Sequence, residues 1–340
     1  MPGLGNPPTV EMCAMNVVDN IPETVKLEEA VCPLCGPGQN KFVLTGHDNL
    51  HDLPGQFTIV ECTNCQLKRT SPRPSANTIG YYYPDDYGPY ASTIVADAAV
   101  KNDDLKSRII ATAKKVFDTK AWALPKFDQP GSMLEIGCAS GNFLHFMAQK
   151  GWRVEGIEFS DDAATTARKL GYRVDSGAVE TIEKQEESFD LLVGWMVIEH
   201  LHDPVSSLKK MAKWAKPNGK LAISVPNAGS AEFALFGSRW YALQLPTHLF
   251  HYDAKSITRV LNAAGWKVTH IQHHRTIANA IASLGYLLRD KGFDGLGQKL
   301  IDFPERGGRL GALLLFPISF LFAMLGQTGR MTIWAAKKPS

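Results

Sequence analysis

The stretch M-L-E-I-G-C-A-S-G-N-F, residues 133–143, runs from a short apolar segment through a loop of small residues into a helical pattern. Small side chains at Gly137, Ala139 and Gly141 allow a ligand to reach the backbone N–H groups of such a strand-to-helix turn. A dinucleotide site would show G-x-G-x-x-G, whereas the spacing here is G-x-A-x-G without a third glycine in register. The loop therefore predicts a ligand site at the end of a strand and argues against NAD.

The residues after this loop alternate short apolar runs with amphipathic segments. The expected helices close on glycines such as Gly151, Gly171 and Gly265, and this alternation builds a parallel sheet with helices on both faces. Glu158 ends the second expected strand, where a carboxylate can accept hydrogen bonds from both hydroxyls of a ribose. The later strands are expected at Y-R-V-D, F-D-L-L-V-G-W, K-L-A-I-S-V-P, W-K-V-T-H-I-Q-H and, after a long apolar interruption, M-T-I-W-A-A-K-K.

Together these motifs resemble the class I S-adenosylmethionine (SAM)-dependent methyltransferases, over residues from about 130 to 275 and again at the final strand. The resemblance rests on L-E-I-G-C-A-S-G-N-F, V-E-G-I-E-F-S, D-S-G-A-V-E and F-D-L-L-V-G-W-M-V-I-E-H-L-H-D-P. Ala139 stands where the family's first motif has its second glycine, and we expect the extra methyl to be tolerated. The resemblance implies an α/β fold with a Rossmann-like, doubly wound, seven-stranded sheet whose last strand is antiparallel.

The resemblance also implies a role for each motif position. Glu135 would orient the amino group of the methionine portion, the backbone from Gly137 to Gly141 would hold that portion, and Glu158 would bind the ribose. Phe159 would pack on the adenine, and Cys138 is expected to be a small packing residue within the loop. The residues expected to bind SAM are Glu135, Gly137, Cys138, Ala139, Gly141, Asn142, Phe143, Glu158, Phe159, Ser160, Ala178, Val179 and Trp195.

Three histidines follow the fourth and fifth expected strands, at the sheet edge where ligands bind in open α/β folds. His200 lies in E-H-L-H-D-P, and His248 and His251 lie in P-T-H-L-F-H-Y, which resembles a segment of many small-molecule and glycan-cluster members. A positioned histidine can remove the proton of a hydroxyl acceptor. His248 is the first candidate for this base. The alternative for each histidine is a hydrogen-bonded packing residue.

Four cysteines form two C-x-x-C pairs, Cys32/Cys35 and Cys62/Cys65, which can bring four thiolates around one tetrahedral zinc. Four protein ligands leave no open position for water, so such a zinc would be structural. Disulfides or a redox C-x-x-C fit an intracellular enzyme less well. The module, with the tyrosine run that follows it, resembles the N-terminal zinc-binding part of bacterial methyltransferases from natural-product and surface-polysaccharide clusters.

Two further segments leave alternatives open. The tyrosine-rich residues 81–90 would either roof the site or pack the two domains together. The uncharged residues 310–329 are expected to form two short helices broken at Pro317, lying on a membrane surface, lining an apolar acceptor site or forming a homodimer interface. The expected divisions are a flexible tail (1–27), a zinc-binding module (28–75), a tyrosine-rich segment with a linker helix at 97–122 (76–126), and the SAM-binding domain (127–340), with the apolar insertion at 276–330.

Composition restricts the partners. The 340 residues carry a net charge of only +2, which gives no electrostatic case for nucleic acid, and the first residues lack the pattern of a secretory signal. We therefore expect a cytoplasmic protein, with peripheral membrane contact through residues 310–329 as one option. The expected reaction is O-methylation of a small-molecule, sugar or lipid-linked glycan acceptor. The alternatives are C-methylation of a nucleotide-linked keto-sugar and a non-catalytic binding module.

Overall fold

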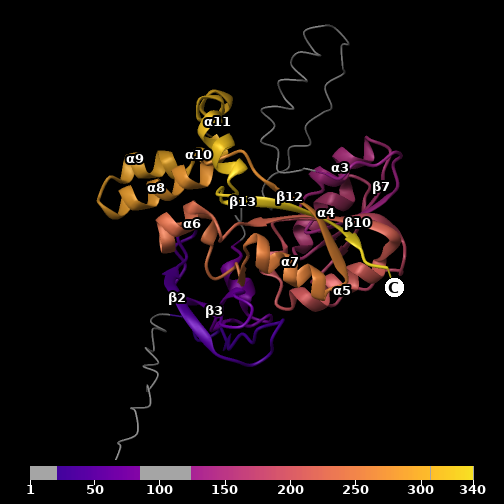
Figure 1. The fold of residues 1–340 in the computed structure, drawn as a ribbon, viewed down its shortest axis with the longest axis horizontal. Coiled ribbons are helices and arrows are strands. Elements are labelled where there is room, and N and C mark those ends of the chain that lie inside the picture. The colour runs from indigo at the N-terminus through magenta and orange to yellow at the C-terminus, as the bar shows by residue number, and fades with distance from the viewer. Residues whose placement is uncertain (1–20, 85–123, 307, 340) are drawn as a thin grey trace, which may run out of the picture.

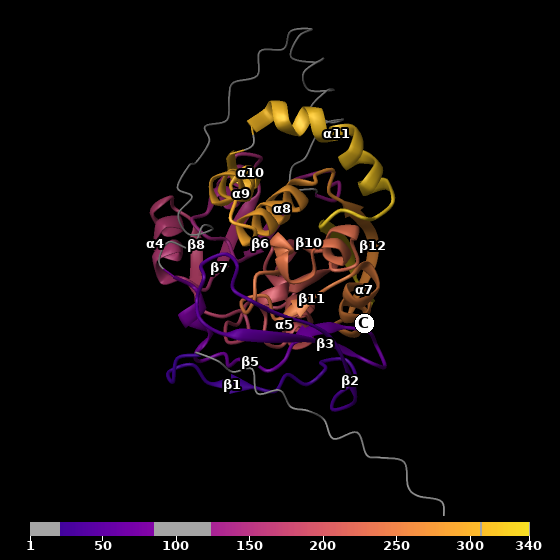
Figure 2. The ribbon, with the colours of Figure 1, turned by 90° about the vertical axis from the view of Figure 1, so that its left-hand side faces the viewer.

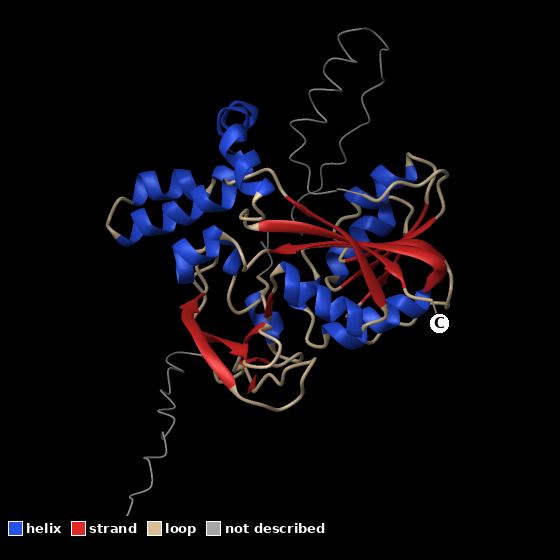
Figure 3. Ribbon diagram, viewed as in Figure 1, coloured by secondary structure: helices blue, strands red, loops and turns tan. Residues whose placement is uncertain are grey.

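The chain is described by a computed structural model over residues 21–84, 124–306 and 308–339. A large twisted sheet forms the centre of the molecule, with helices on both of its faces (Figures 1 and 3). The expected linker helix at 97–122 and the second half of the tyrosine run lie outside the described residues. The strands of the large sheet are β6 (Ser132–Ile136), β7 (Arg153–Glu158), β8 (Arg173–Ser176), β9 (Phe189–Trp195), β10 (Ala215–Pro226), β12 (Trp266–His273) and β13 (Arg330–Lys337).

The strand order of this sheet is β12-β13-β10-β9-β6-β7-β8. Strand β6 pairs in parallel with β7 and with β9, and β10 pairs in parallel with β9, whereas β13 is antiparallel to both β10 and β12. The predicted Rossmann-like, seven-stranded sheet with an antiparallel last strand is therefore confirmed. The order changes direction at β6, so the carboxyl ends of β6 and β9 form the edge where open α/β sheets bind ligands.

Alternating side chains of the buried strands supply two apolar cores, one on each face of the sheet. Met133 packs with residues of α3 (Asn142–Ala148) and α4 (Asp161–Lys169), while the next residue, Leu134, packs with residues of α5 (Pro204–Trp214) and α7 (Ala254–Ala263). This is the two-residue period of a strand covered on both faces. The two helical layers thus hold the strand ends in fixed positions.

The cysteine module joins the rest of the chain through a second sheet, with strand order β11-β4-β3-β2. Three of its strands come from the module: β2 (Asn40–His47), β3 (Gln56–Cys62) and β4 (Lys68–Thr70). The fourth, β11 (Phe250–His251), comes from the P-T-H-L-F-H-Y segment and pairs antiparallel with β4. Residues about 180 positions apart are therefore hydrogen-bonded within one sheet, and Figure 2 shows the module lying beneath the large sheet. A small separate ribbon pairs β1 (Leu27–Glu28) with β5 (Arg73–Pro74).

The chain between β12 and β13 is helical, as predicted for this insertion. Helices α8 (Ala278–Asp290) and α9 (Asp294–Ile301) lie side by side, and the short α10 (Phe303–Arg306) leads into α11 (Gly308–Met324). The prediction of two short helices broken at Pro317 is wrong, because α11 runs through this proline. A proline removes only one helical N–H donor, so it can bend a helix without ending it. No helix among the described residues is long and apolar enough to cross a bilayer.

Candidate active site and cysteine cluster

The glycine loop lies between β6 and α3, at the ligand-binding edge of the large sheet. Gly137, Ala139 and Gly141 all have positive φ, at 69°, 44° and 86°. A Cβ on Gly137 would come within 2.5 Å of Val197 Cγ2, and one on Gly141 within 2.9 Å of Ala167 Cβ. Both glycines are thus required by backbone conformation and by close packing. Ala139 adopts the same left-handed conformation with a side chain, and its extra methyl is accommodated there.

Glu158 is locked to this loop by backbone donors. Its carboxylate accepts hydrogen bonds from Ala139 N at 2.8 Å and from Ser160 N at 2.9 Å. Burial raises the pKa of Glu158, and these backbone hydrogen bonds oppose the shift. Each oxygen still has a lone pair for a ribose hydroxyl, because a carboxylate oxygen can accept two hydrogen bonds. The predicted ribose ligand therefore stands beside the glycine loop, as its role requires.

Two buried polar atoms near this loop lack partners among the described residues. Glu135 Oε2 accepts no hydrogen bond, and Trp195 Nε1 donates none. Burial, reinforced by the charge of Glu158, raises the pKa of Glu135 well above its ordinary value. A carboxylate that needs a donor fits the ammonium group of a methionine moiety, which is the role predicted for Glu135. These orphaned atoms, together with the glycine loop, fit SAM.

The other predicted SAM-binding residues lie around the same loop. Phe159 follows β7 with 52% of its surface exposed, so its ring is available for an adenine to stack on. Phe143 begins α3 and makes an edge contact with Trp195, with ring centroids 5.2 Å apart. Cys138 points into the core, as expected, since a Cβ on Gly156 would meet its sulfur at 2.5 Å. Asn142 is the first residue of α3, Ser160 caps α4, and Ala178 and the buried Val179 follow β8.

Past the end of β9, a second cluster brings together Glu199, His200 and His248. One nitrogen of each histidine and a carboxylate oxygen of Glu199 lie within 4.8 Å of one another. Each histidine has its Nδ1 next to a backbone carbonyl, at 2.9 Å from Thr247 O for His200 and 3.0 Å from Ala242 O for His248. If Nδ1 carries the proton, Nε2 keeps its lone pair and is the basic atom of the ring. Such a set can move a proton or hold a cation.

Burial controls the charge of this cluster. It raises the pKa of Glu199 to about 8 and lowers that of His200 to about 4. The pKa of His248 also lies well below its ordinary value because of burial, with the charges of His200 and His251 acting in the same direction. Neither oxygen of Glu199 has a hydrogen-bond partner among the described residues. The cluster therefore consists of neutral imidazoles beside a carboxyl group that is free to take up or release a proton.

The three predicted histidines are not all in one place. His200 and His248 are in edge contact, with ring centroids 4.6 Å apart. His251 is buried in β11, and its Nε2 lies 3.1 Å from the hydroxyl of Thr70 in the cysteine module. It thus joins two parts of the chain, which is the packing role that was its alternative.

Sequence reasoning missed two residues of this site. Glu199 belongs to the E-H-L-H-D-P motif, and the signal that identifies it is an acid directly before a candidate base. Tyr83 was treated only as part of an aromatic run. Its hydroxyl lies 2.9 Å from His200 Nδ1, and its ring centroid is 6.3 Å from that of Phe159. Tyr82 is fully buried in a cluster that joins Phe57 of the module to Trp240 of the later chain, which agrees with the packing alternative, whereas Tyr83 lies between Phe159 and His200.

The four cysteines converge, as the two C-x-x-C pairs predicted. Their sulfurs lie within 4.8 Å of one another, and all four are free thiols. Each pair forms the same turn: Gly36 N donates to Cys32 O at 2.9 Å, and Gln66 N donates to Cys62 O at 2.8 Å, with both donors at positive φ. Arg259 of α7 donates to the carbonyl of Cys65. This donor set fits a tetrahedral zinc closed to further ligands.

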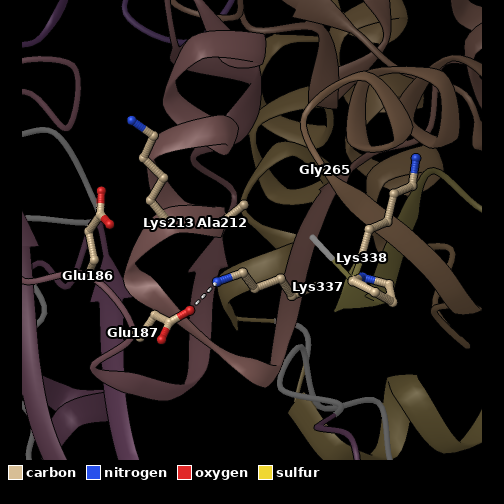
Figure 4. A pocket seen from close by; sticks show the side chains of 8 residues that line it. Glu186, Glu187, Ala212, Lys213, Gly265, Lys337 and Lys338 are labelled. Carbon is tan, nitrogen blue, oxygen red and sulfur yellow. Dashed lines mark ion pairs between the residues drawn. The ribbon is translucent and has the colours of Figure 1, made fainter.

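A surface hollow of about 460 Å³ lies away from both clusters. It is lined by charged side chains, among them Glu187 and Lys337, whose ion pair spans 3.6 Å (Figure 4). Glu187 precedes β9 and Lys337 ends the antiparallel β13, so the hollow is at the amino ends of the parallel strands. It is therefore on the opposite edge of the sheet from the glycine loop.

Comparison with known proteins agrees with the geometry of the glycine loop. Residues 109–271 match a family described as "Methyltransferase domain". A ubiquinone biosynthesis O-methyltransferase from Xanthomonas oryzae is 31% identical over 144 residues, which cover 39% of this chain and 59% of that protein. A homologue of the same name from Xanthomonas campestris is 30% identical over 148 residues, covering 40% and 61%. The chain thus spans about three fifths of the length of these curated relatives.

Among solved structures, a SAM-dependent methyltransferase from Mesorhizobium loti aligns with a TM-score of 0.41 and 12% identity. The alignment covers 67% of this chain and 98% of that one. The strand order, the glycine loop with its two acidic partners and the matched domain lead to one conclusion. The chain contains a class I SAM-dependent methyltransferase domain.

Proposed function

We propose that this protein transfers the methyl group of SAM to a hydroxyl of a small-molecule, sugar or lipid-linked glycan acceptor. The observation that carries the proposal is the cluster of Glu199, His200 and His248, which stands past the end of β9 at the edge that holds the glycine loop. The relatives from Xanthomonas are O-methyltransferases by name, which favours a hydroxyl over a carbon or nitrogen acceptor.

The cofactor would be held by groups already in position. Glu158 would accept hydrogen bonds from both ribose hydroxyls, and Glu135 would accept one from the methionine ammonium. The backbone N–H groups of residues 137–141 would donate hydrogen bonds to the methionine portion. Phe159 would stack on the adenine. SAM supplies a methyl group on an activated sulfonium, so the protein mainly has to align the acceptor, a contribution of up to about 7–11 kcal/mol in ideal cases.

His248 would take the proton of the acceptor hydroxyl. Its Nδ1 is bonded to Ala242 O, which fixes the ring and leaves Nε2 as the basic atom. Once Glu199 has released its own proton, its carboxylate would stabilise the imidazolium that forms, and His200, held by Thr247 O, would keep the pair in place. A positioned base of this kind contributes roughly 10²–10⁴-fold to the rate.

The cysteine cluster would hold one structural zinc. The support is the closed set of four sulfurs and the matching turns of the two pairs. Because β4 pairs with β11, this zinc would also steady the segment that carries His248.

The exposed face of α11 would rest on a membrane surface and bring the site to a lipid-linked acceptor. Leu314, Ile318 and Leu321 are spaced by about one helical turn, and each is more than half exposed. An apolar stripe on a helix that cannot span the bilayer is typical of interfacial binding.

Calorimetry with SAM tests the central proposal. We expect one SAM to bind per chain, and Glu158→Ala combined with Gly137→Val to abolish binding, because the pair removes the ribose acceptor and fills the loop. A wild-type protein that does not bind SAM, or a double variant that binds it unchanged, would rule out the methyl-transfer function.

A further inference from the structure

The peptide unit between His248 and Leu249 is held from two sides. Leu249 N donates to the backbone carbonyl of Glu199 at 2.8 Å, which ties one side to the residue that shares the cluster with the proposed base. The carbonyl of His248 accepts from the hydroxyl of Thr70 at 2.9 Å, which ties the other side to β4 of the cysteine module. The backbone that carries the proposed base is thus fixed between Glu199 and Thr70.

A further contact fixes the direction of the Thr70 hydroxyl. Its oxygen lies 3.1 Å from Nε2 of His251, on the strand that pairs with β4. A hydroxyl has one proton, and because that proton points to the His248 carbonyl, the oxygen has to accept from His251. His251 then carries its own proton on Nε2, which agrees with a neutral ring, since burial lowers its pKa to about 3. Two hydrogen bonds in series therefore run from His251 through Thr70 to the backbone of His248.

Burial and backbone pairing give this hydroxyl a distinct task. Thr70 is completely buried, and His248 and His251 are 1% and 3% exposed, so bulk water does not reach the hydroxyl. Thr70 N also donates to the carbonyl of Leu249 at 2.9 Å, a bond that any side chain at position 70 other than proline would keep. The backbone pairing thus attaches the two segments, and the hydroxyl adds the contact that is directed at His248.

We propose that Thr70 is a positioning residue for His248, whose ring it holds in place beside Glu199 and His200. The inference rests on the proposed methyl transfer, in which His248 takes the proton of the acceptor hydroxyl. A displacement of about 1 Å can cost roughly 10²-fold in rate. We therefore expect loss of the Thr70 hydroxyl to slow methyl transfer by roughly 10- to 100-fold. SAM affinity should not change, because Thr70 lies outside the residues that would hold the cofactor.

Spectra of the histidine rings test the position without an acceptor. We would record nuclear magnetic resonance spectra of the full chain with isotope-labelled histidine and bound S-adenosylhomocysteine, and identify the His248 signals by their loss in His248→Ala. Thr70→Val keeps the volume and removes the hydroxyl, so the ring signals of His248 should shift or broaden. Thr70→Ser keeps the hydroxyl and should restore the wild-type signals. Unmoved His248 signals in Thr70→Val would overturn the proposal.

A second variant reaches the same chain of hydrogen bonds from its other end. His251→Leu takes away the donor that orients the Thr70 hydroxyl, so it should also move the His248 signals, and to a smaller extent. This variant decides the question if Thr70→Val does not fold, and unchanged His248 signals in it would then refute the positioning role.

The matched control removes a hydroxyl from the same small sheet, farther from His248. Thr45 of β2 and Thr58 of β3 pair their hydroxyls at 3.2 Å, and β3 and β4 lie between β2 and β11. Thr45→Val should leave the His248 signals and methyl transfer as in wild type. The unfolding midpoint and the metal content of each variant show whether the module is intact. A lower midpoint in Thr70→Val with His248 signals in place would make Thr70 a structural residue only.

Methyl transfer separates this inference from the proposed function. We would follow a labelled methyl group from SAM to catechol and to methyl glucoside, and we expect Thr70→Val to lower kcat with the KM for SAM unchanged and Thr70→Ser to recover the rate. If SAM fails to bind wild type, the proposed function fails, and if neither probe is methylated the His248 spectra still decide about Thr70. If wild type and Thr70→Val transfer the methyl group equally fast, only the present inference fails.

Discussion

His248 is the residue for which position and chemistry agree most closely. It is buried at 1% exposure, yet its ring stands within reach of Glu199 and His200. We expect His248→Ala to keep SAM affinity and to reduce methyl transfer by roughly 10²–10⁴-fold, as for loss of a general base. Calorimetry would follow the first and transfer of a labelled methyl group the second. The exposed His270 of β12 provides a matched control. Intact turnover in His248→Ala would make this histidine a packing residue.

Glu199 makes a pH-dependent contribution to stability. Burial raises its pKa from 4.5 to about 8 in the folded chain, so the folded state favours the protonated form. This contribution is complete below about pH 4.5 and is lost as the pH rises through 8. Relative to Glu199→Gln, wild type should lose roughly 2–5 kcal/mol of unfolding free energy between pH 5 and 8. Denaturant unfolding at several pH values measures this difference. Parallel curves for the two proteins would contradict the buried, unpaired carboxyl group.

Residue identities in the glycine loop were predictable because short-range geometry requires them. Gly137 and Gly141 have positive φ and pack closely against neighbouring side chains, so the backbone of the loop requires glycine at both positions. The sequence predicts only part of the grouping of Glu199 with His200 and His248. Two of its members are adjacent in sequence, but the third arrives through β11, whose position depends on distant pairing.

At the scale of elements, we expect the two cysteine turns to stabilise the module that contains β4 by binding a metal. We expect one zinc per chain by metal analysis, and we expect Cys62→Ala to lose the metal and lower the unfolding midpoint, because four sulfurs would no longer close the site. Cys138→Ala, which removes a core thiol, should keep the zinc. Well under one zinc per chain in the wild type would refute the assignment.

Element prediction succeeded where the apolar pattern was long and failed where it was short. Long apolar runs in the sequence predict strands β6, β9 and β10. Gly151 and Gly171, which both have positive φ, mark the ends of the neighbouring helices. Strand β11 has only two residues, too few for any period. Pro317 was assigned too much weight, since the flanking apolar residues continue α11 through it.

At the scale of the whole molecule, α11 lies at one extremity, away from the cysteine module (Figure 2). We expect the full chain to co-sediment with anionic lipid vesicles, and we expect Ile318→Lys combined with Leu321→Lys to prevent this, because both side chains are exposed on the apolar stripe. Phe42→Lys, which changes an exposed ring on β2, serves as the control. A dimer in light scattering that dissociates in the double variant would show that the stripe joins two copies instead.

The β4–β11 pairing has a consequence for how this protein can change over evolution. The segment from Gln244 to Tyr252 carries His248 and forms an edge strand of the sheet of the cysteine module. Through His251 and the carbonyl of His248 it is also the hydrogen-bond partner of the Thr70 hydroxyl. A module borrowed from another protein would have to present a strand in the same register and a hydroxyl at the same place. The cysteine module and the methyltransferase domain therefore cannot be exchanged independently, and substitutions in one restrict the substitutions that the other can accept.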